Sequence, residues 1–146
     1  MSLEQIAADY EKYYKELEEE AKAVVFEEFK KIFVKYPHLT AIKWSQYTPY
    51  FNDGDECTFG VNDFCITNVE DIENITSYGE YDGDLPEGKF CEYLYGKYKT
   101  DYPEVYALEK FAGSDVGSGV FKGAFGNHVS VTATPDGIDS EDYDHD

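Results

Sequence analysis

Residues 41–66, AIKWSQYTPYFNDGDECTFGVNDFCI, contain two runs of alternating apolar and polar side chains on either side of an Asp53-Gly54 pair. The first run is AIKWSQY and the second is CTFGVN. Alternation with a period of two is typical of strands that bury one face, and a glycine at positive φ favours a hairpin turn. Pro49 has no N–H to donate to a ladder, so we expect a tip longer than two residues.

On the N-terminal side of this hairpin, apolar residues recur mostly at spacings of three and four, which predicts an amphipathic helix over residues 3–35. They are Ile6, Tyr10, Tyr13, Leu17, Ala21, Val24, Val25, Phe29 and Ile32. Ser2 can cap the start of the helix, and Pro37 stops it. At ~1.5 Å per residue the helix is roughly 50 Å long, so its first turns are expected to project. We expect the rest to lie across the sheet; a coiled-coil partner is the alternative.

On the C-terminal side, HVSVTAT at residues 128–134 supplies a third alternating run. The sequence therefore predicts an α+β fold: the long helix packs on a three-stranded antiparallel sheet, with short helices inserted before the last strand. Trp44 is expected to be buried against the long helix. We expect residues 1–135 to form a single domain and residues 136–146, which are rich in aspartate, to form a mobile acidic tail.

The chain carries a formal net charge of -19 and has a sequence pI near 4.3. All twelve basic residues are lysine, so no guanidinium is present to grip phosphate. The charge is concentrated: residues 44–88 contain eleven acids and no lysine. Such a surface repels nucleic acid and anionic membranes, which predicts a basic partner.

Other features bear on the cellular setting. No apolar run approaches the roughly 20 residues that span a bilayer, and MSLEQIAADYEK does not resemble a signal peptide. Cys57, Cys65 and Cys91 are odd in number and form no C-x-x-C pair, which favours reduced thiols. We therefore expect a cytoplasmic protein.

Known site motifs do not fit this sequence. An EF-hand loop with Gly54 at its sixth position has Pro49 at its first, and one with Gly83 at its sixth position has Lys89 at its last. The cysteines and histidines lack zinc spacing, and no Walker or dinucleotide fingerprint is complete. We expect no cofactor, no metal site and no catalytic residue, although weak Ca²⁺ or Mg²⁺ binding by carboxylates stays open.

One family resemblance is visible in the residues. WSQYTPYFNDGDECTF, together with FGNHVSVTAT and the terminal EDYDHD, resembles an uncharacterised family of small acidic proteins from bacteria and tailed phages with a YTPYFNDGD motif. No activity is attached to that family. The resemblance implies a shared fold and a bacterial or phage setting, which would place a phage-encoded protein in the host cytoplasm.

Charge and resemblance together favour a non-enzymatic acidic binding protein that mimics nucleic acid and inhibits a host nucleic-acid-binding or defence protein. The expected partner-binding residues are Tyr47, Tyr50, Phe51, Asp53, Asp55, Glu56, Asp63, Glu80, Asp82 and Asp84. One alternative is a small hydrolase-like enzyme on the polar sheet face, with Lys43, Tyr47, His128 and Ser130 as candidates. The other is an assembly protein that binds through its first helix.

Overall fold

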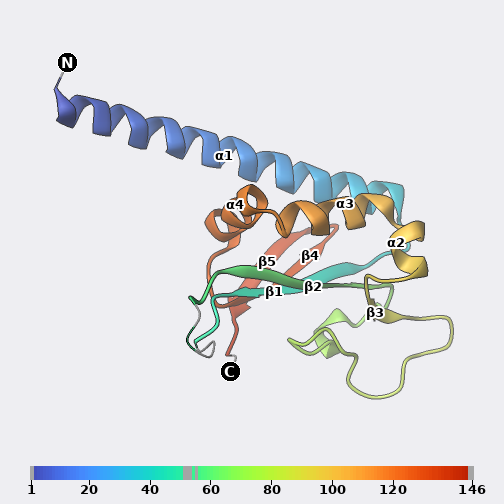
Figure 1. Ribbon diagram of the computed structural model, residues 1–146. Helices are drawn as coiled ribbons and strands as arrows, with labels where there is room; N and C mark the ends of the chain where they lie inside the picture. The colour runs from blue at the N-terminus through green and yellow to red at the C-terminus, as the bar shows by residue number, and fades with distance from the viewer. Residues whose placement is uncertain (1, 51–53, 55, 145–146) are drawn as a thin grey trace.

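A computed structural model describes residues 2–50, 54 and 56–144 (Figure 1). The elements along the chain are α1 (Leu3–Lys35), β1 (Ala41–Tyr47), β2 (Gly60–Thr67), the 3-10 helix η1 (Ile72–Asn74), β3 (Cys91–Tyr93), α2 (Lys97–Asp101), α3 (Pro103–Ala112), α4 (Asp115–Phe125), β4 (Val129–Thr134) and β5 (Gly137–Asp142). The strands form one antiparallel sheet in the order β3-β2-β1-β4-β5. The α+β fold with a long N-terminal helix is confirmed.

Helix α1 has the predicted bounds. The Ser2 hydroxyl accepts a hydrogen bond from the Gln5 backbone N–H at 3.1 Å, which satisfies one of the free donors of the first turn. The buried residues of α1 all lie in its C-terminal third: Val25, Phe29, Ile32 and Phe33. The first turns extend beyond the sheet and the other helices (Figure 1). Tertiary packing therefore holds only the second half of the helix.

The sheet has five strands, so the prediction of three was incomplete. Strand β5 pairs with β4 along its whole length, from Thr134 opposite Gly137 to Val129 opposite Asp142. Residues 137–142 are thus an edge strand, and the prediction of a mobile tail from residue 136 was wrong for them. Strand β3 forms the opposite edge, in the part of the chain where only short helices before the last strand were expected.

The second predicted strand, expected over residues 57–62, is observed as Gly60–Thr67, and a bulge interrupts its alternation. Lys43 pairs with Cys65, and Ser45 pairs with Asn62, so two residues of β2 stand opposite Trp44. Asp63 takes the extra position with φ of 43°. The bulge returns Phe64 to the core face, where it is fully buried.

The core lies between this face of the sheet and helices α1, α3 and α4 (Figure 1). Trp44 is buried at 2% exposure, as predicted, and stacks on Phe29 with ring centroids 5.2 Å apart. The Trp44 indole N–H donates to the Gln46 side-chain oxygen at 2.9 Å. The Gln46 amide nitrogen donates to the Phe121 carbonyl at 2.9 Å, which links this polar pair to α4. Among the described residues no buried side-chain nitrogen or oxygen lacks a hydrogen-bond partner.

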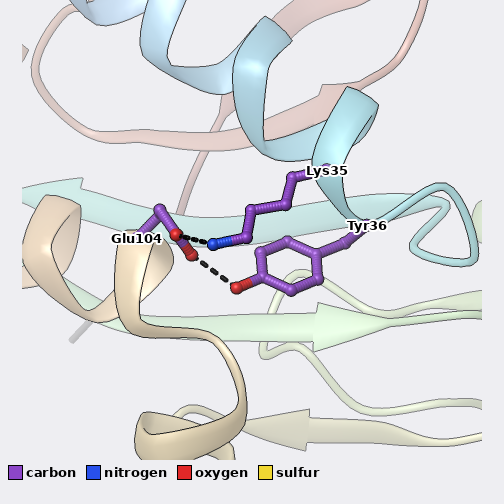
Figure 2. Close-up of polar contacts among 3 residues, drawn as sticks. All are labelled: Lys35, Tyr36 and Glu104. Carbon is purple, nitrogen blue, oxygen red and sulfur yellow. Dashed lines mark hydrogen bonds and ion pairs between the residues drawn. The ribbon is translucent and has the colours of Figure 1, made fainter.

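A polar cluster joins the end of α1 to the start of α3. The Lys35 ammonium and the Tyr36 hydroxyl both donate to the Glu104 carboxylate (Figure 2). Glu104 lies in the first turn of α3, where the helix dipole also favours negative charge. The bonds from Lys35 and Tyr36 lower the pKa of Glu104 to about 2 from its ordinary 4.5.

This lowered pKa predicts a specific acid sensitivity. Because the folded state holds the ionised form of Glu104, its stabilising contribution is present above pH 4.5 and is lost as the pH falls toward 2. We expect Glu104→Gln to destabilise the fold at neutral pH and to approach the wild type near pH 2.5. Urea unfolding, followed by Trp44 fluorescence at several pH values, measures both proteins.

Glu27→Gln is the matched control, because it removes one exposed carboxylate that is paired with Lys30 within a single helix. Its free energy of unfolding should differ from the wild type by less than ~1 kcal/mol at neutral pH. A Glu104→Gln variant with the same loss of stability at pH 7 and at pH 2.5 would contradict the assignment.

Candidate functional site

The sheet face opposite the helices carries polar rows that the strand register defines. Opposing residues on neighbouring strands share a face. One row, from β3 to β5, is Tyr93, Cys65, Lys43, Thr132 and Asp139. The next row is Asn62, Ser45, Ser130 and Glu141. We call this surface the polar face.

A small cavity of about 130 Å³ opens on the polar face. One wall is formed by a loop that folds over the strands and that we call the covering loop: Ser77, Tyr78 and Gly79. The floor is formed by Lys43, Ser45 and Tyr47. Tyrosine rings frame the opening. The Tyr143 ring lies 5.6 Å from that of Tyr47 and 6.1 Å from that of Tyr78, measured between centroids.

Lys43 is the cation of this cavity, and it is buried at 7% exposure. Its ammonium donates to the Ile75 carbonyl at 3.3 Å. Burial lowers the pKa of Lys43, and the nearby Glu141 carboxylate partly opposes that shift. Lys43 therefore helps to hold the loop on the sheet.

A thiol pair holds the same loop. Cys65 on β2 and Cys91 on β3 have sulfur atoms 3.4 Å apart, and both thiols donate to the Gly79 carbonyl, at 3.2 and 3.1 Å. The bond with Cys91, together with burial, raises the pKa of Cys65. Cys65 therefore stays a protonated packing residue.

Acidic side chains surround the cavity. Asp63, at the β2 bulge, and Glu80, just after the covering loop, are both exposed. Burial raises the pKa of Tyr93, and the nearby negative charges, which include Asp63 and Glu80, raise it further. Asp139 and Glu141 add two more exposed carboxylates from β5.

These acids have no lysine partner within the part of the chain that the structure describes. The three ion pairs found there are Lys30 with Glu27, Lys31 with Glu28 and Lys35 with Glu104. All three use glutamates of α1 or α3. The exposed negative charge of the polar face is therefore offset only in part, by the buried Lys43, whose charge interacts with Glu141.

The structure brings some of the predicted partner-binding residues together. Tyr47, Asp63 and Glu80 meet around the cavity. Tyr50 is 64% exposed and stacks on His128 with ring centroids 5.0 Å apart, outside the cavity lining. The other predicted residues are dispersed or lie outside the described residues. Glu56 is exposed before β2, Asp82 and Asp84 are exposed on the 70–88 loop, and Phe51, Asp53 and Asp55 lie outside the described residues.

The sequence interpretation missed Tyr93, Tyr143, Asp139 and Glu141 as members of this face. For β5 a signal existed: Thr134-Pro135-Asp136-Gly137 is a turn sequence between the alternating run and a second run, residues 137–142, in which Ile138 is the one large apolar residue. The high acid content of the second run outweighed that signal. For Tyr93 no local signal exists, because a three-residue strand has almost no periodicity.

The four candidates for an enzyme on the polar face are only partly assembled. Lys43 and Tyr47 line the cavity, whereas Ser130 is buried beside it at 2% exposure and does not line it. His128 faces Tyr50 instead. No arrangement of a nucleophile, a base and an orienting acid is formed by these four residues.

Comparisons with known proteins give this chain no family or function. The chain matches no known family model, no curated protein and no solved structure. Among the described residues no group of three or more His, Cys, Asp or Glu side chains is placed to hold a metal ion. None of the described helices combines the length and the apolar character that crossing a membrane requires.

The covering loop depends on Gly79, which yields a prediction with an internal control. A Cβ at Gly79 would stand 3.0 Å from the Cys65 Cβ, whereas one at Gly88 would meet nothing within 4 Å. The two glycines have nearly equal φ, +77° and +79°, so alanine is strained to a similar extent at both. We expect Gly79→Ala to lose roughly 1–3 kcal/mol more of unfolding free energy than Gly88→Ala, in urea titrations. Equal losses would mean that the loop does not pack on the thiol pair.

Proposed function

We propose that this chain is a non-enzymatic acidic protein that binds a basic, nucleic-acid-binding partner and occupies the groove in which that partner holds DNA or RNA. In the setting that the family resemblance implies, it is phage-encoded and inhibits a host nucleic-acid-binding or defence protein in the host cytoplasm. The observation that carries the proposal is the acidic surface around the polar face, whose exposed carboxylates form no ion pair among the described residues.

Charge placement supports a binding role over a solubilising one. A surface that only needs solubility usually mixes both signs of charge. Here the lysine pairs of the described residues lie on the helices, while Asp63, Glu80, Asp139 and Glu141 have none. Concentrated charge of one sign destabilises a fold by self-repulsion, so its retention favours a role in recognition.

The scaffold under this charge is firm. Asp139 and Glu141 stand on paired strands, and the loop that carries Glu80 is held by the thiol pair and by Lys43. Duplex DNA presents one negative charge per ~1.7 Å of axis, and carboxylates at fixed positions imitate such an array. Tyr47, Tyr78, Tyr93 and Tyr143 add contact area at low entropic cost.

The test is capture of the partner from host cells on the immobilised full chain, followed by competition with duplex DNA. We expect the captured protein to be released by DNA and by salt. The triple variant Asp63→Asn, Glu80→Gln, Asp139→Asn should bind roughly tenfold more weakly, since each exposed charge pair is worth up to ~1 kcal/mol. Its affinity should also depend less steeply on salt concentration.

A matched triple variant in the projecting helix, Glu4→Gln, Glu11→Gln, Glu19→Gln, changes the net charge by the same amount at a distance from the polar face. It should bind as the wild type does. Equal weakening by both triple variants would indicate a response to net charge alone. A partner that DNA does not displace would eliminate the mimic proposal.

A further inference from the structure

We propose that the projecting half of α1, together with the groove between α1 and helices α3–α4, binds an amphipathic helix of a partner protein whose apolar stripe is edged by lysine or arginine. This surface lies on the helical side of the domain and is separate from the polar face. The proposal does not depend on nucleic-acid mimicry.

The first observation is an apolar stripe on α1 that the rest of the described chain leaves exposed. It follows a heptad spacing, and its members keep 40–83% of their surface exposed: Leu3, Ile6, Tyr10, Tyr13, Leu17 and Val24. Alternating spacings of three and four place such residues on one side of a helix. An apolar stripe of this length on a surface helix is typical of a binding site.

The second observation is that the stripe runs into a groove. One hollow of about 400 Å³ and another of about 570 Å³ lie between α1 and α3–α4, and they share Ala21 and Phe111. Leu17 and Val24 belong to both the stripe and the groove walls. A helix laid along α1 would thus contact two sides, which is the helix-in-groove mode of recognition.

The third observation is the sign of the charge along this surface, which determines the kind of helix that fits. The charged residues that line the hollows along the stripe and groove are all carboxylates: Asp9, Glu18, Glu28, Glu104 and Asp115. Glu28 and Glu104 are paired with lysines, whereas Asp9, Glu18 and Asp115 are not in any ion pair among the described residues. The helical spacing puts Lys12, Lys15 and Lys22 on the side of α1 away from the stripe.

The same charges disfavour a second copy of this chain as the occupant. The stripe of a second copy would bring its own Asp9, Glu16 and Glu20 against the acidic groove. Like charges along a helix pair destabilise it, while lysines at the flanking positions complete it. A basic-edged helix satisfies both the apolar stripe and the acidic border.

The probe for this site is a labelled designed peptide of about three heptads, with leucine at positions a and d and lysine at e and g. The lysines also keep the peptide from pairing with itself. The control peptide carries glutamate at e and g and is otherwise identical. Fluorescence anisotropy with the full chain should give a dissociation constant at least about tenfold lower for the lysine peptide.

Variants locate the binding. Tyr10→Ser with Leu17→Ser should weaken binding of the lysine peptide by about tenfold or more. Both side chains are substantially exposed, so the fold should persist, and Trp44 fluorescence checks this. Val34→Ser is the matched control, because Val34 is an 81% exposed apolar residue of the same helix outside the stripe; it should bind as the wild type does.

Each other outcome overturns the proposal. Equal binding of both peptides would indicate unspecific apolar contact. If the lysine peptide does not bind and sedimentation shows a dimer that Tyr10→Ser/Leu17→Ser abolishes, a second copy of the chain is the occupant. If the peptide does not bind and the protein is a monomer, the stripe does not have this role. In the DNA competition described above, the Tyr10→Ser/Leu17→Ser variant should behave as the wild type, so the two proposals fail separately.

Discussion

Phe29 of α1 lies flat against Trp44 of β1, with ring planes 7° apart, and this contact fixes how the long helix sits on the sheet. Phe64, Phe121 and Phe125 pack around the same indole. Gln46, two residues along β1, accepts from the indole and donates to the backbone of α4. The Trp44 side chain thus connects α1, two strands and α4. This packing on the core face of the sheet also stabilises the strand register that defines the polar face on the other side.

The parts of the fold that could be predicted from sequence are those with long, regular periodicity. Helix α1 has 33 residues, and its bounds were predicted correctly from its apolar spacing and the cap at Ser2. Strands β1 and β4 followed from alternation, and Trp44 was correctly placed in the core. The bulge at Asp63 interrupts the alternation of β2, which is why the predicted run ended at Asn62 and missed residues 63–67. Strand β3 pairs through three residues, too few for any pattern.

The candidate site was less predictable than the fold, because it is made by contacts distant in sequence. Tyr47 and Tyr143 are far apart in sequence. Their rings are neighbours because β5 pairs with β4, which in turn pairs with β1, and Tyr143 directly follows β5. Tyr78 arrives there through a loop that depends on the thiol pair and Gly79. The acidic composition was evident from the sequence, but its separation from the helix lysines became visible only in the fold. Distribution of charge, more than its amount, distinguishes a binding surface from a solubilising one.

Strand β5 has a consequence for the fold itself as well as for binding. It is an edge strand, and among the described residues no strand pairs with the outer side of its backbone. Open edges invite pairing with strands of other molecules, and natural proteins block this with charge. The acids Asp139, Glu141 and Asp142 lie along that edge, so two molecules that approach edge to edge meet carboxylate against carboxylate. The same residues that form part of the proposed recognition surface therefore also keep the sheet from growing beyond five strands.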